Sequence, residues 1–411
     1  MSPRVAVIGG GIAGSMAAFS LRAVGGATPV VFDAGKRIGG RIGGGTNETG
    51  PGGDNGAQFF RASTQKFGSL LKFLESHHIV GPWEGEFGIL GTRSGRDGFL
   101  SRTHMPTELL GSLKPGGSLA HSQALAVDTG DFCGFIEGQG TLYSGIPSNG
   151  SVCPQILQLC GAEVRTDTRV TSVRRISAAS GGWQVTSEAD QSEIFDAVIF
   201  ATHDASVPAA CITELATDTH SPEVHERLQE LTKALLNARA NRVPVFTLSA
   251  EVACGGEVVP FDAVTVHGSQ RIQFLVRDSS KPGRIAAKGK KHELWTCISS
   301  SALAAWVLSK NNTTAAAFVQ AQHELTEELS TILAPFYDTP PVVTNPYVRR
   351  WSAAFTNATL ESWSRQEEEC VSLEPFRLAI AGDFVRRHGC PIESAALSGL
   401  EAGERVGSWL K

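Results

Sequence analysis

An apolar run that ends in glycines is the feature that most limits what this chain can form. Val5–Ile8 has the β-branched, apolar character of a buried parallel strand. Three glycines follow at Gly9–Gly11, and the Ala- and Leu-rich stretch Ile12–Arg22 has the composition of a helix. Pro29–Asp33 is a second apolar strand. The first 33 residues therefore predict a β-α-β unit, which requires a parallel sheet covered by helices.

The glycines have the spacing of a dinucleotide-binding turn. Gly9, Gly11 and Gly14 form the pattern G-x-G-x-x-G directly between the expected strand and helix. Gly9 permits the tight turn, Gly11 lets the backbone approach a pyrophosphate, and Gly14 lets the helix pack closely on the strand. Asp33 lies 19 residues after Gly14, where a carboxylate can accept hydrogen bonds from a ribose. The pattern predicts a bound dinucleotide; a tight turn without a ligand is the alternative.

Composition narrows the class of protein. There are 36 Lys and Arg residues against 41 Asp and Glu, a net charge of −5, which argues against a nucleic-acid-binding surface. We find no basic leader before an apolar core and no run of about 20 apolar residues, so we expect a cytoplasmic chain with no membrane partner. The eight cysteines are scattered without a CxxC pair, so we expect no metal site.

Further motifs resemble those of a flavoprotein fold. Arg37–Arg41 reads Arg-x-Gly-Gly-Arg, Gly382-Asp383 follows the apolar run Leu378–Ala381, and Glu393–Gly399 opens a helix. With the glycine turn, this set resembles the FAD-binding fold shared by amine oxidases and aromatic hydroxylases. The resemblance implies that the Arg-x-Gly-Gly-Arg turn runs beside the pyrophosphate and flavin, and that Gly-Asp meets the ribityl and phosphate region. It also implies that the last helix points its N-terminus at the flavin pyrimidine carbonyl, where it stabilises negative charge.

Within this fold the chain resembles the renalase family. The pieces that carry the resemblance occur in the family's order and span nearly the whole chain: Asp54–Phe60, Arg277–Arg284, Arg350–Ala353, Gly382-Asp383 and Ala395–Gly399. The chain departs from the family at Asp33, where glutamate is commoner, and at Thr296–Ser299, where His-Ala-Ser is expected. Residues 85–150 show little likeness, so the substrate can differ from that of the family.

We predict an α/β protein with two parts. The first is a Rossmann-type FAD-binding domain, a parallel sheet with helices, formed by residues 1–84, 150–205 and 340–411. The second is an inserted α+β substrate domain with a mixed or antiparallel sheet, formed by residues 85–149 and 206–339. Strands are expected at 163–176, 182–187, 194–201, 243–250, 271–277 and 294–299, and helices at 63–79, 222–240, 315–333 and 394–410.

The resemblance also implies which residues contact non-covalently bound FAD. They are Gly9, Gly11, Ala13, Gly14, Asp33, Arg41, Gly56, Ala57, Gln58, Phe59, Val170, Gly382, Asp383, Ala395, Ala396 and Leu397. Some amine oxidases tether flavin through a cysteine upstream of the Gly-Asp pair. Cys370 lies 12 residues before Gly382, but renalases have no such tether and we expect none.

Two residues are candidates for catalysis, and one basic stretch has two interpretations. Trp351 either caps the core of a sheet or forms a wall of the flavin cavity. His203 follows a strand that runs toward the cofactor, and it is either a supporting residue or an acid–base group. The stretch Lys281, Arg284, Lys288, Lys290 and Lys291 is either a solvated loop, which we favour, or a phosphate clamp.

Three functions remain open. A renalase-like oxidoreductase would oxidise dihydronicotinamide dinucleotide isomers to NAD(P) by hydride transfer to flavin N5, and molecular oxygen would reoxidise the flavin and give peroxide. This transfer needs little acid–base help, because the nicotinamide ring becomes aromatic as the hydride leaves. An amine oxidase would need an aromatic pocket and often a lysine near flavin N5, yet there are only three tyrosines. The third function is a flavin-binding protein without turnover.

Overall fold

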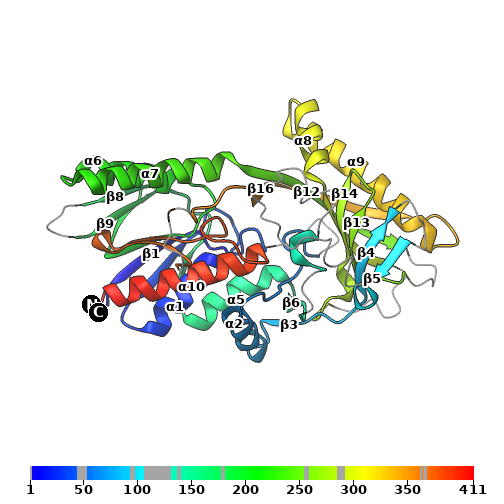
Figure 1. Cartoon of the computed structure of the whole chain (residues 1–411), viewed down its shortest axis with the longest axis horizontal. Helices are drawn as coiled ribbons and strands as arrows, with labels where there is room; N and C mark the ends of the chain where they lie inside the picture. Colours follow the sequence, from blue (N-terminus) through cyan, green and yellow to red (C-terminus); the bar gives the residue numbers. More distant parts are fainter. Residues whose placement is uncertain are drawn as a thin grey trace.

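Two large sheets lie side by side along the long axis of the molecule (Figure 1). One is six-stranded and mostly parallel, and the other is seven-stranded and mixed. The computed structural model describes residues 2–43, 53–92, 98–105, 131–136, 140–176, 181–253, 259–284, 292–361, 363 and 368–411. The predicted α/β class, with a Rossmann-type sheet beside a second mixed sheet, is confirmed.

The parallel sheet is built from the predicted β-α-β unit and strands that return to it from far along the chain. Its order is β17-β18-β11-β1-β2-β7, and β17 is an antiparallel edge. The strands are β1 (Arg4–Ile8), β2 (Thr28–Phe32), β7 (Glu163–Arg165), β11 (Ala197–Phe200), β17 (Val371–Leu373) and β18 (Leu378–Ile380). Val7 in the central strand pairs with Val31 on one side and Ile199 on the other. The inner strands β1, β2, β11 and β18 are buried along almost their whole length because both faces are covered, whereas the edge strand β7 is mostly exposed.

Helices cover one face of this sheet, and strands with two further helices cover the other (Figure 1). The first face carries α1 (Ile12–Val24), α2 (Gln65–Ser76), α5 (Val152–Cys160) and α10 (Pro391–Trp409). The second face carries β8 (Val170–Arg175), β9 (Trp183–Ser187), β10 (Ser192–Phe195), α6 (Ser206–Asp218) and α7 (Pro222–Ala240). Pro222 at the start of α7 and the Ser221 hydroxyl, which accepts from the Val224 N–H, fix that helix start as the sequence suggests.

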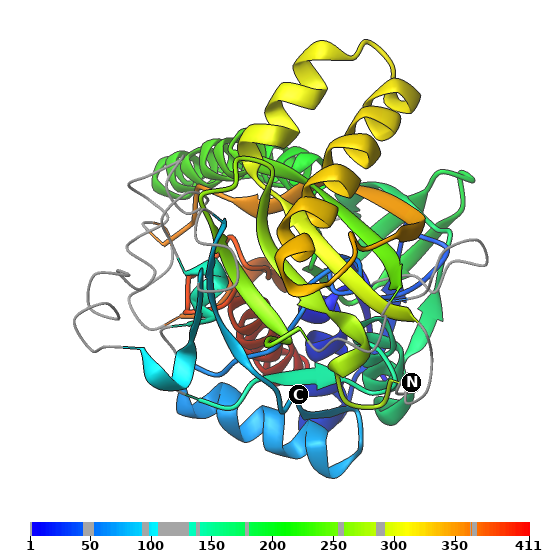
Figure 2. The same ribbon diagram turned by 90° about the vertical axis from the view of Figure 1, so that its right-hand side faces the viewer.

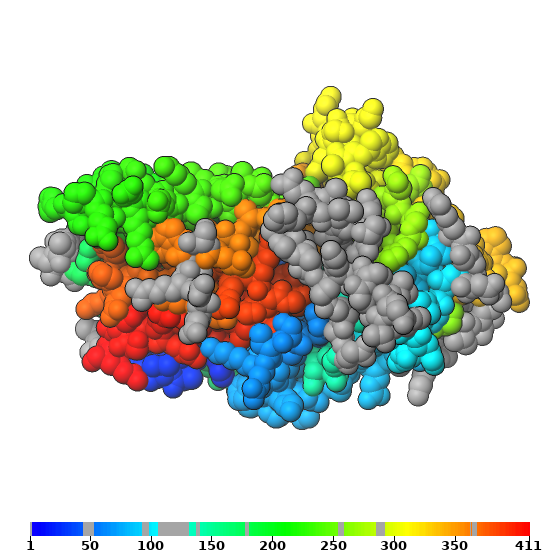
Figure 3. All heavy atoms as spheres, viewed as in Figure 1, coloured from blue at the N-terminus to red at the C-terminus, as the bar shows by residue number. Residues whose placement is uncertain are grey.

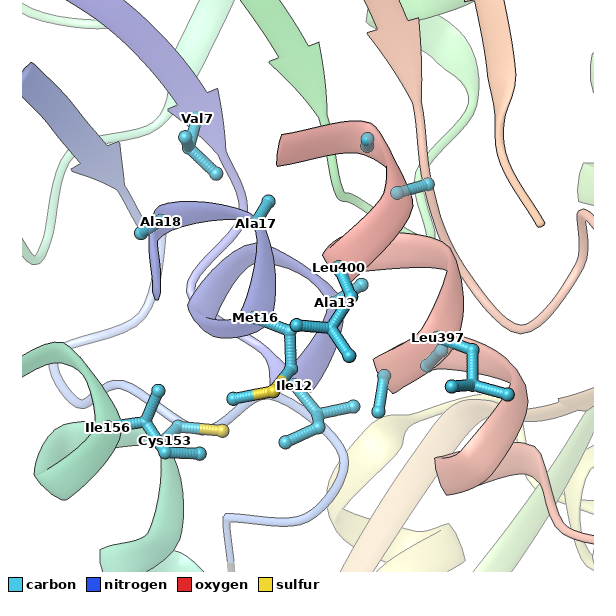
Figure 4. Close-up of a cluster of buried hydrophobic side chains, with 14 of the residues drawn as sticks. Val7, Ile12, Ala13, Met16, Ala17, Ala18, Cys153, Ile156, Leu397 and Leu400 are labelled. Carbon is cyan, nitrogen blue, oxygen red and sulfur yellow. The ribbon is translucent and has the colours of Figure 1, made fainter. Parts of the chain in front are cut away.

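Glycines allow α1 and α10 to pack unusually closely. A Cβ on Gly399 would overlap the carbonyl oxygen of Ala13, and one on Gly403 would lie 2.8 Å from Cβ of Ser20. Figure 4 shows α1 between α10 and α5, with Ala13 facing α10 and Met16 reaching toward α5. The backbone of α10 therefore takes its position directly from the backbone of α1.

The seven-stranded sheet forms the other half, in the order β16-β12-β15-β14-β13-β4-β5. Its strands are β4 (Phe87–Gly91), β5 (Phe99–Ser101), β12 (Arg242–Ala253), β13 (Ala263–His267), β14 (Ile272–Arg277), β15 (His292–Ser299) and β16 (Val343–Thr356). Helices α8 (Ser301–Lys310) and α9 (Thr314–Leu333) pack on it and project from the body (Figures 2 and 3). A short ladder joins β3 (Val80–Pro82) to β6 (Tyr143–Gly145). In the part of the chain described, no helix is both long and apolar enough to cross a bilayer.

Two expected strands are wrong in detail. Residues 163–176 form two strands, β7 and β8, in different sheets, because the chain turns at Asp167, which has φ +52°. Residues 194–201 likewise divide at Asp196 into antiparallel β10 and parallel β11.

Two segments pack with the other half of the molecule than the one we expected. Residues 206–240, which we assigned to the substrate domain, pack with the parallel sheet. Residues 343–356, assigned to the FAD-binding domain, form the edge of the other sheet.

The close contact between α1 and α10 predicts that a Gly→Ala change in α10 destabilises the protein at some positions and not at others. We expect Gly399→Ala to lower the free energy of unfolding by about 1–3 kcal/mol, because the methyl group meets a backbone carbonyl that cannot move aside. Gly407→Ala is the control, since its Cβ would lie 3.2 Å from a Val24 methyl group and the helix gains from losing a glycine. Urea unfolding measures both; equal effects would contradict the close packing.

Candidate functional site

A cavity of about 610 Å³ lies where the two sheets meet. Its wall includes the carboxyl ends of β1 and β2 together with residues of β12, β15 and β16. Ligands bind at the carboxyl edge of the strands in open α/β sheets. The volume is also within the usual range for small-molecule sites, about 300–1,000 Å³. This cavity is the candidate functional site.

The turn between β1 and α1 forms one end of the cavity. Gly9 has φ +113°, and a Cβ there would overlap the carbonyl oxygen of Ala201. A Cβ on Gly14 would overlap the carbonyl oxygen of Gly9. Gly11 has φ −76°, and the nearest atom to a Cβ at that position would be Cα of Gly40 at 3.9 Å. The turn itself requires Gly9 and Gly14, whereas a side chain at Gly11 would meet no close obstacle and would stand at the wall of the cavity.

Asp33 connects the end of β2 to this turn. Its Oδ2 accepts a hydrogen bond from the Gly10 N–H at 2.8 Å, and its Oδ1 accepts one from the Gly35 N–H at 2.7 Å. Each carboxylate oxygen has two acceptor positions, so Asp33 can also accept hydrogen bonds from a ligand. Asp33 also lines the cavity, and its contact with a ribose stays a prediction.

An ion pair joins two cavity loops that lie 342 residues apart in the sequence. Arg41 Nη1 donates to Asp383 Oδ2 at 2.7 Å, and Nη2 donates to Oδ1 at 2.5 Å. Arg41 Nη1 also donates to the Ala354 carbonyl at 3.3 Å. Such two-pronged pairs fix geometry as well as charge. The sequence indicated each residue separately, but not that they pair.

The segment 54–60 is held by a buried cluster of ionic side chains. Lys281 Nζ is fully buried and donates to Asp278 at 2.7 Å, to Gln58 at 2.9 Å and to Asp54 at 3.2 Å. Arg284 pairs with Asp54 and with Asp278. Burial alone would raise the pKa of Asp278, but the positive charges of Lys281 and Arg284 outweigh it and hold that pKa below its ordinary value.

This cluster corrects our interpretation of the basic stretch. Lys281 and Arg284 are neither in a solvated loop nor free to clamp a phosphate, because two buried carboxylates already neutralise them. The partners lie in the segment 54–60 and in the turn at 278–280, which sequence inspection could not bring together. Lys288, Lys290 and Lys291 lie outside the described residues.

Aromatic and aliphatic side chains line the other end of the cavity. They come from both halves of the chain and include Phe59, Phe132, Val245, Ile298, Trp351 and Phe355. Trp351 Nε1 donates to the Asn55 carbonyl at 2.7 Å, and the Arg349 guanidinium stacks 4.0 Å from the Trp351 ring centre. Trp351 is therefore held in the wall of the cavity by two contacts, and its place beside a flavin stays a prediction.

His203 follows β11 and lines the cavity and a small adjoining recess. Its pKa is lowered to about 4, first because neighbouring atoms remove part of its hydration, and then because Arg41 and Arg242 repel a further positive charge. Below neutral pH the imidazole thus stays uncharged down to about pH 4. A neutral ring can donate or accept a hydrogen bond but does not supply a positive charge.

Most of the residues expected to contact a cofactor line this cavity: Gly9, Gly11, Ala13, Asp33, Arg41, Gly56, Ala57, Gln58, Phe59, Val170, Gly382, Asp383 and Ala395. Gly14, Ala396 and Leu397 lie in the buried core behind the wall. Cys370 is also in that core, where burial raises the pKa of its thiol. Phe132, Thr247 and Ile298 line the cavity but were not singled out from the sequence. Thr247 and Ile298 lie in strands, where alternation shows which residues share a face but not what that face meets. Phe132 lies in a short 3-10 turn without such a pattern.

The first turn of α10 closes the cavity between its two ends. Cys390, Pro391, Ile392 and Ala395 line the wall there. Glu393, on the same turn, is fully buried and accepts hydrogen bonds from the N–H and hydroxyl groups of Ser63 and Thr64. Within the described ranges, no group of three or more His, Cys, Asp and Glu side chains is arranged to hold a metal ion.

Comparisons with known proteins agree with this architecture. Residues 7–76 match the NAD(P)-binding Rossmann-like domain family. No curated protein sequence matches the chain. A structure assigned as a protoporphyrinogen oxidase from Exiguobacterium sp. 255-15 is similar over 98% of this chain and 99% of its own, with 14% identity and a TM-score of 0.59. A putrescine oxidase bound to putrescine is similar over 99% and 98%, with 14% identity and a TM-score of 0.58. An oxidoreductase from Methanosarcina mazei is similar over 96% of this chain and 98% of its own, with 14% identity and a TM-score of 0.58.

The ionic cluster predicts a stability loss that depends on pH. We expect Lys281→Met to lower the free energy of unfolding by about 3–5 kcal/mol at pH 7, because two buried carboxylates then share one cation. The pKa of Asp278 in the folded chain is lowered from its ordinary value of 3.8. The ionised carboxylate therefore stabilises the fold above about pH 3.8, and this stabilisation is lost as the pH falls through the lowered pKa. The deficit of the variant should therefore shrink below about pH 4. Urea unfolding across this range measures it.

The double variant Asp278→Asn/Lys281→Met is the control for that experiment. It removes one charge of each sign and leaves Arg284 paired with Asp54. We expect it to recover part of the loss at pH 7. A single variant that is no less stable than the double variant at every pH would contradict the proposed charge balance.

Proposed function

We propose that this chain is an oxidoreductase that binds FAD without a covalent bond. The observation that carries the proposal is that the glycine turn at Gly9 and Gly11 lines one end of a cavity whose other end is aromatic. Helix α1 begins at Ile12 beside this turn, and the free N–H groups and positive end of a helix suit a pyrophosphate. A dinucleotide with a flat ring system fits both ends.

The residues that would hold FAD follow from this orientation. Asp33 would accept hydrogen bonds from the ribose, and the α1 N-terminus would hold the pyrophosphate. The Arg41–Asp383 pair would contact the phosphate and ribityl region, and Trp351 would flank the ring system. When bound, FAD accepts a hydride from a substrate carbon and returns the electrons to molecular oxygen, giving peroxide.

The substrate that we propose is a dihydronicotinamide nucleotide, oxidised to its NAD(P) form. The renalase-like segments support this choice, as does an apolar, aromatic end where a flat ring can stack. The reaction needs positioning rather than proton transfer. That agrees with a cavity whose histidine, His203, is uncharged at neutral pH.

Positive charge beside the cavity also supports a phosphorylated substrate. Arg41, Arg239 and Arg242 surround the small recess that adjoins the main cavity. Arg41 pairs with Asp383 and Arg239 with Asp204, while Arg242 makes no ion pair within the described ranges. A phosphate group near the mouth of this recess would balance the excess charge.

A small amine is the second substrate class, favoured by the likeness in fold to putrescine oxidase. Against it, no lysine of the described part of the chain lines the cavity, and Lys281 is held in the ionic cluster. We therefore rank the dihydronicotinamide first.

The cofactor proposal predicts that one side chain can exclude FAD without unfolding the protein. In Gly11→Val the new side chain starts from an unstrained backbone at the cavity wall, and its Cβ has only Cα of Gly40 within 4 Å. The change of N-cap residue costs α1 about 1 kcal/mol. We expect FAD affinity to fall at least about a hundredfold. Gly140→Val is the control, because a Cβ there meets nothing within 4 Å. Quenching of FAD fluorescence measures binding; equal affinity in both variants would place the pyrophosphate elsewhere.

The substrate proposal predicts which compounds bleach the bound flavin. Under anaerobic conditions, the 2- and 6-dihydro isomers of NAD(P) should bleach it within seconds, and ordinary 4-dihydro NADH only slowly. Air should then restore the colour and release one peroxide per turnover. Stopped-flow absorbance measures both steps. Bleaching by a primary amine or polyamine alone would favour an amine oxidase, and no bleaching by either class would favour a flavin-binding protein without turnover.

A further inference from the structure

One arginine behind the cavity wall is buried and forms an ion pair with no carboxylate in the described part of the chain. Arg61 follows the segment 54–60 and is only 7% exposed. Its Nε has no hydrogen-bond partner, and its Nη2 lies 3.5 Å from the Gly389 carbonyl, which is long for a hydrogen bond. It makes no ion pair with any described residue. Arg41, Lys281 and Arg284, by contrast, are all paired with carboxylates.

Two glycines form the slot that holds this guanidinium group. A Cβ on Gly389 would lie 2.7 Å from Arg61 Nη2, and one on Gly134 would overlap the same atom. The next residue after Gly389, Cys390, lines the cavity at the start of α10, and so does Cys133, the residue before Gly134. The charge of Arg61 therefore lies directly behind the part of the wall formed by these two cysteines.

The charge of Arg61 reaches the cavity wall. Burial raises the pKa of both the Cys133 and Cys390 thiols, and Arg61 opposes that rise in each. The N-terminus of α10, a 19-residue helix, adds its partial positive charge at the same point. The other charged groups nearby are Asp131, which acts on Cys133, the buried carboxylate of Glu393, which acts on Cys390, and Arg102, a second cation. The charge of Arg61 therefore acts on the cavity through a wall that includes two neutral thiols.

Burying an unpaired cation opposes folding, so hydrophobic packing does not explain why a charge occupies this slot. We propose that Arg61 stabilises negative charge on a ligand at the α10 end of the cavity. Under the proposed function, on which this inference rests, that ligand is the reduced cofactor, whose ring system carries more negative charge than the oxidised form. Arg61 would then be a positioning residue that favours binding of reduced over oxidised FAD.

Anaerobic titration of each variant with oxidised and with reduced FAD tests this inference. In Arg61→Gln we expect the ratio of reduced to oxidised affinity to fall about tenfold, the size expected for loss of one partly screened charge. Arg61→Lys should keep most of the ratio. Arg102→Gln is the matched control, because it removes a nearby cation that is less buried, and it should change the ratio less than about twofold.

Thermal unfolding of the FAD-free variants separates this role from a structural one. We expect Arg61→Gln to unfold at the same temperature as the natural chain or higher, since an unpaired buried charge is removed. An unchanged ratio in Arg61→Gln, or equal losses of both affinities with a lower unfolding temperature, would overturn the inference while leaving FAD binding intact. A natural chain that binds neither form of FAD would overturn the proposed function, and the inference with it.

Discussion

Helix α1 lies closer to its neighbours than side chains would permit. Gly14 brings the start of α1 against the carbonyl oxygen of Gly9, Gly9 lies against Ala201 at the end of β11, and Gly399 brings α10 against the carbonyl oxygen of Ala13. Because α1 contacts both the strand ends and α10, its position also fixes where α10 begins. Two helix N-termini thereby open on the same cavity, at the carboxyl edge of the parallel sheet. The positions of both helix N-termini therefore depend on close backbone contacts, which a side chain at Gly9, Gly14 or Gly399 would prevent.

Charge around the cavity is organised in three different ways. The pair Arg41–Asp383 is neutral and joins two loops at the cavity, and the cluster around Lys281 is neutral and holds the segment 54–60. Arg61 is buried and has no ion pair with any residue that the structure describes. The neutral groups keep the backbone of the site in place, since breaking them would leave buried charges. Arg61, which has no such partner among the described residues, lies behind the wall where α10 meets the cavity.

The sequence predicts features that depend on residues close together in the chain better than features that depend on residues far apart in it. The strands and helices of the β-α-β unit follow from local apolar runs and glycine spacing, and α7 was predicted over its full length of 222–240. The single strand expected at 163–176 was wrong because the turn at Asp167 has no glycine or proline to mark it. The solvated loop expected at Lys281 was wrong because its carboxylate partner Asp54 lies 227 residues away. The wall residue Phe132 comes from a segment without periodicity, so only the folded chain shows its place.

The visible absorption spectrum of the protein, purified without added cofactor and then heated, tests the central claim most directly. The account predicts the two visible bands of a flavin in the native protein, and FAD released into the supernatant when the protein precipitates. Two results would contradict it. One is a colourless protein that does not take up FAD when incubated with it, and the other is a flavin that remains with the precipitated chain.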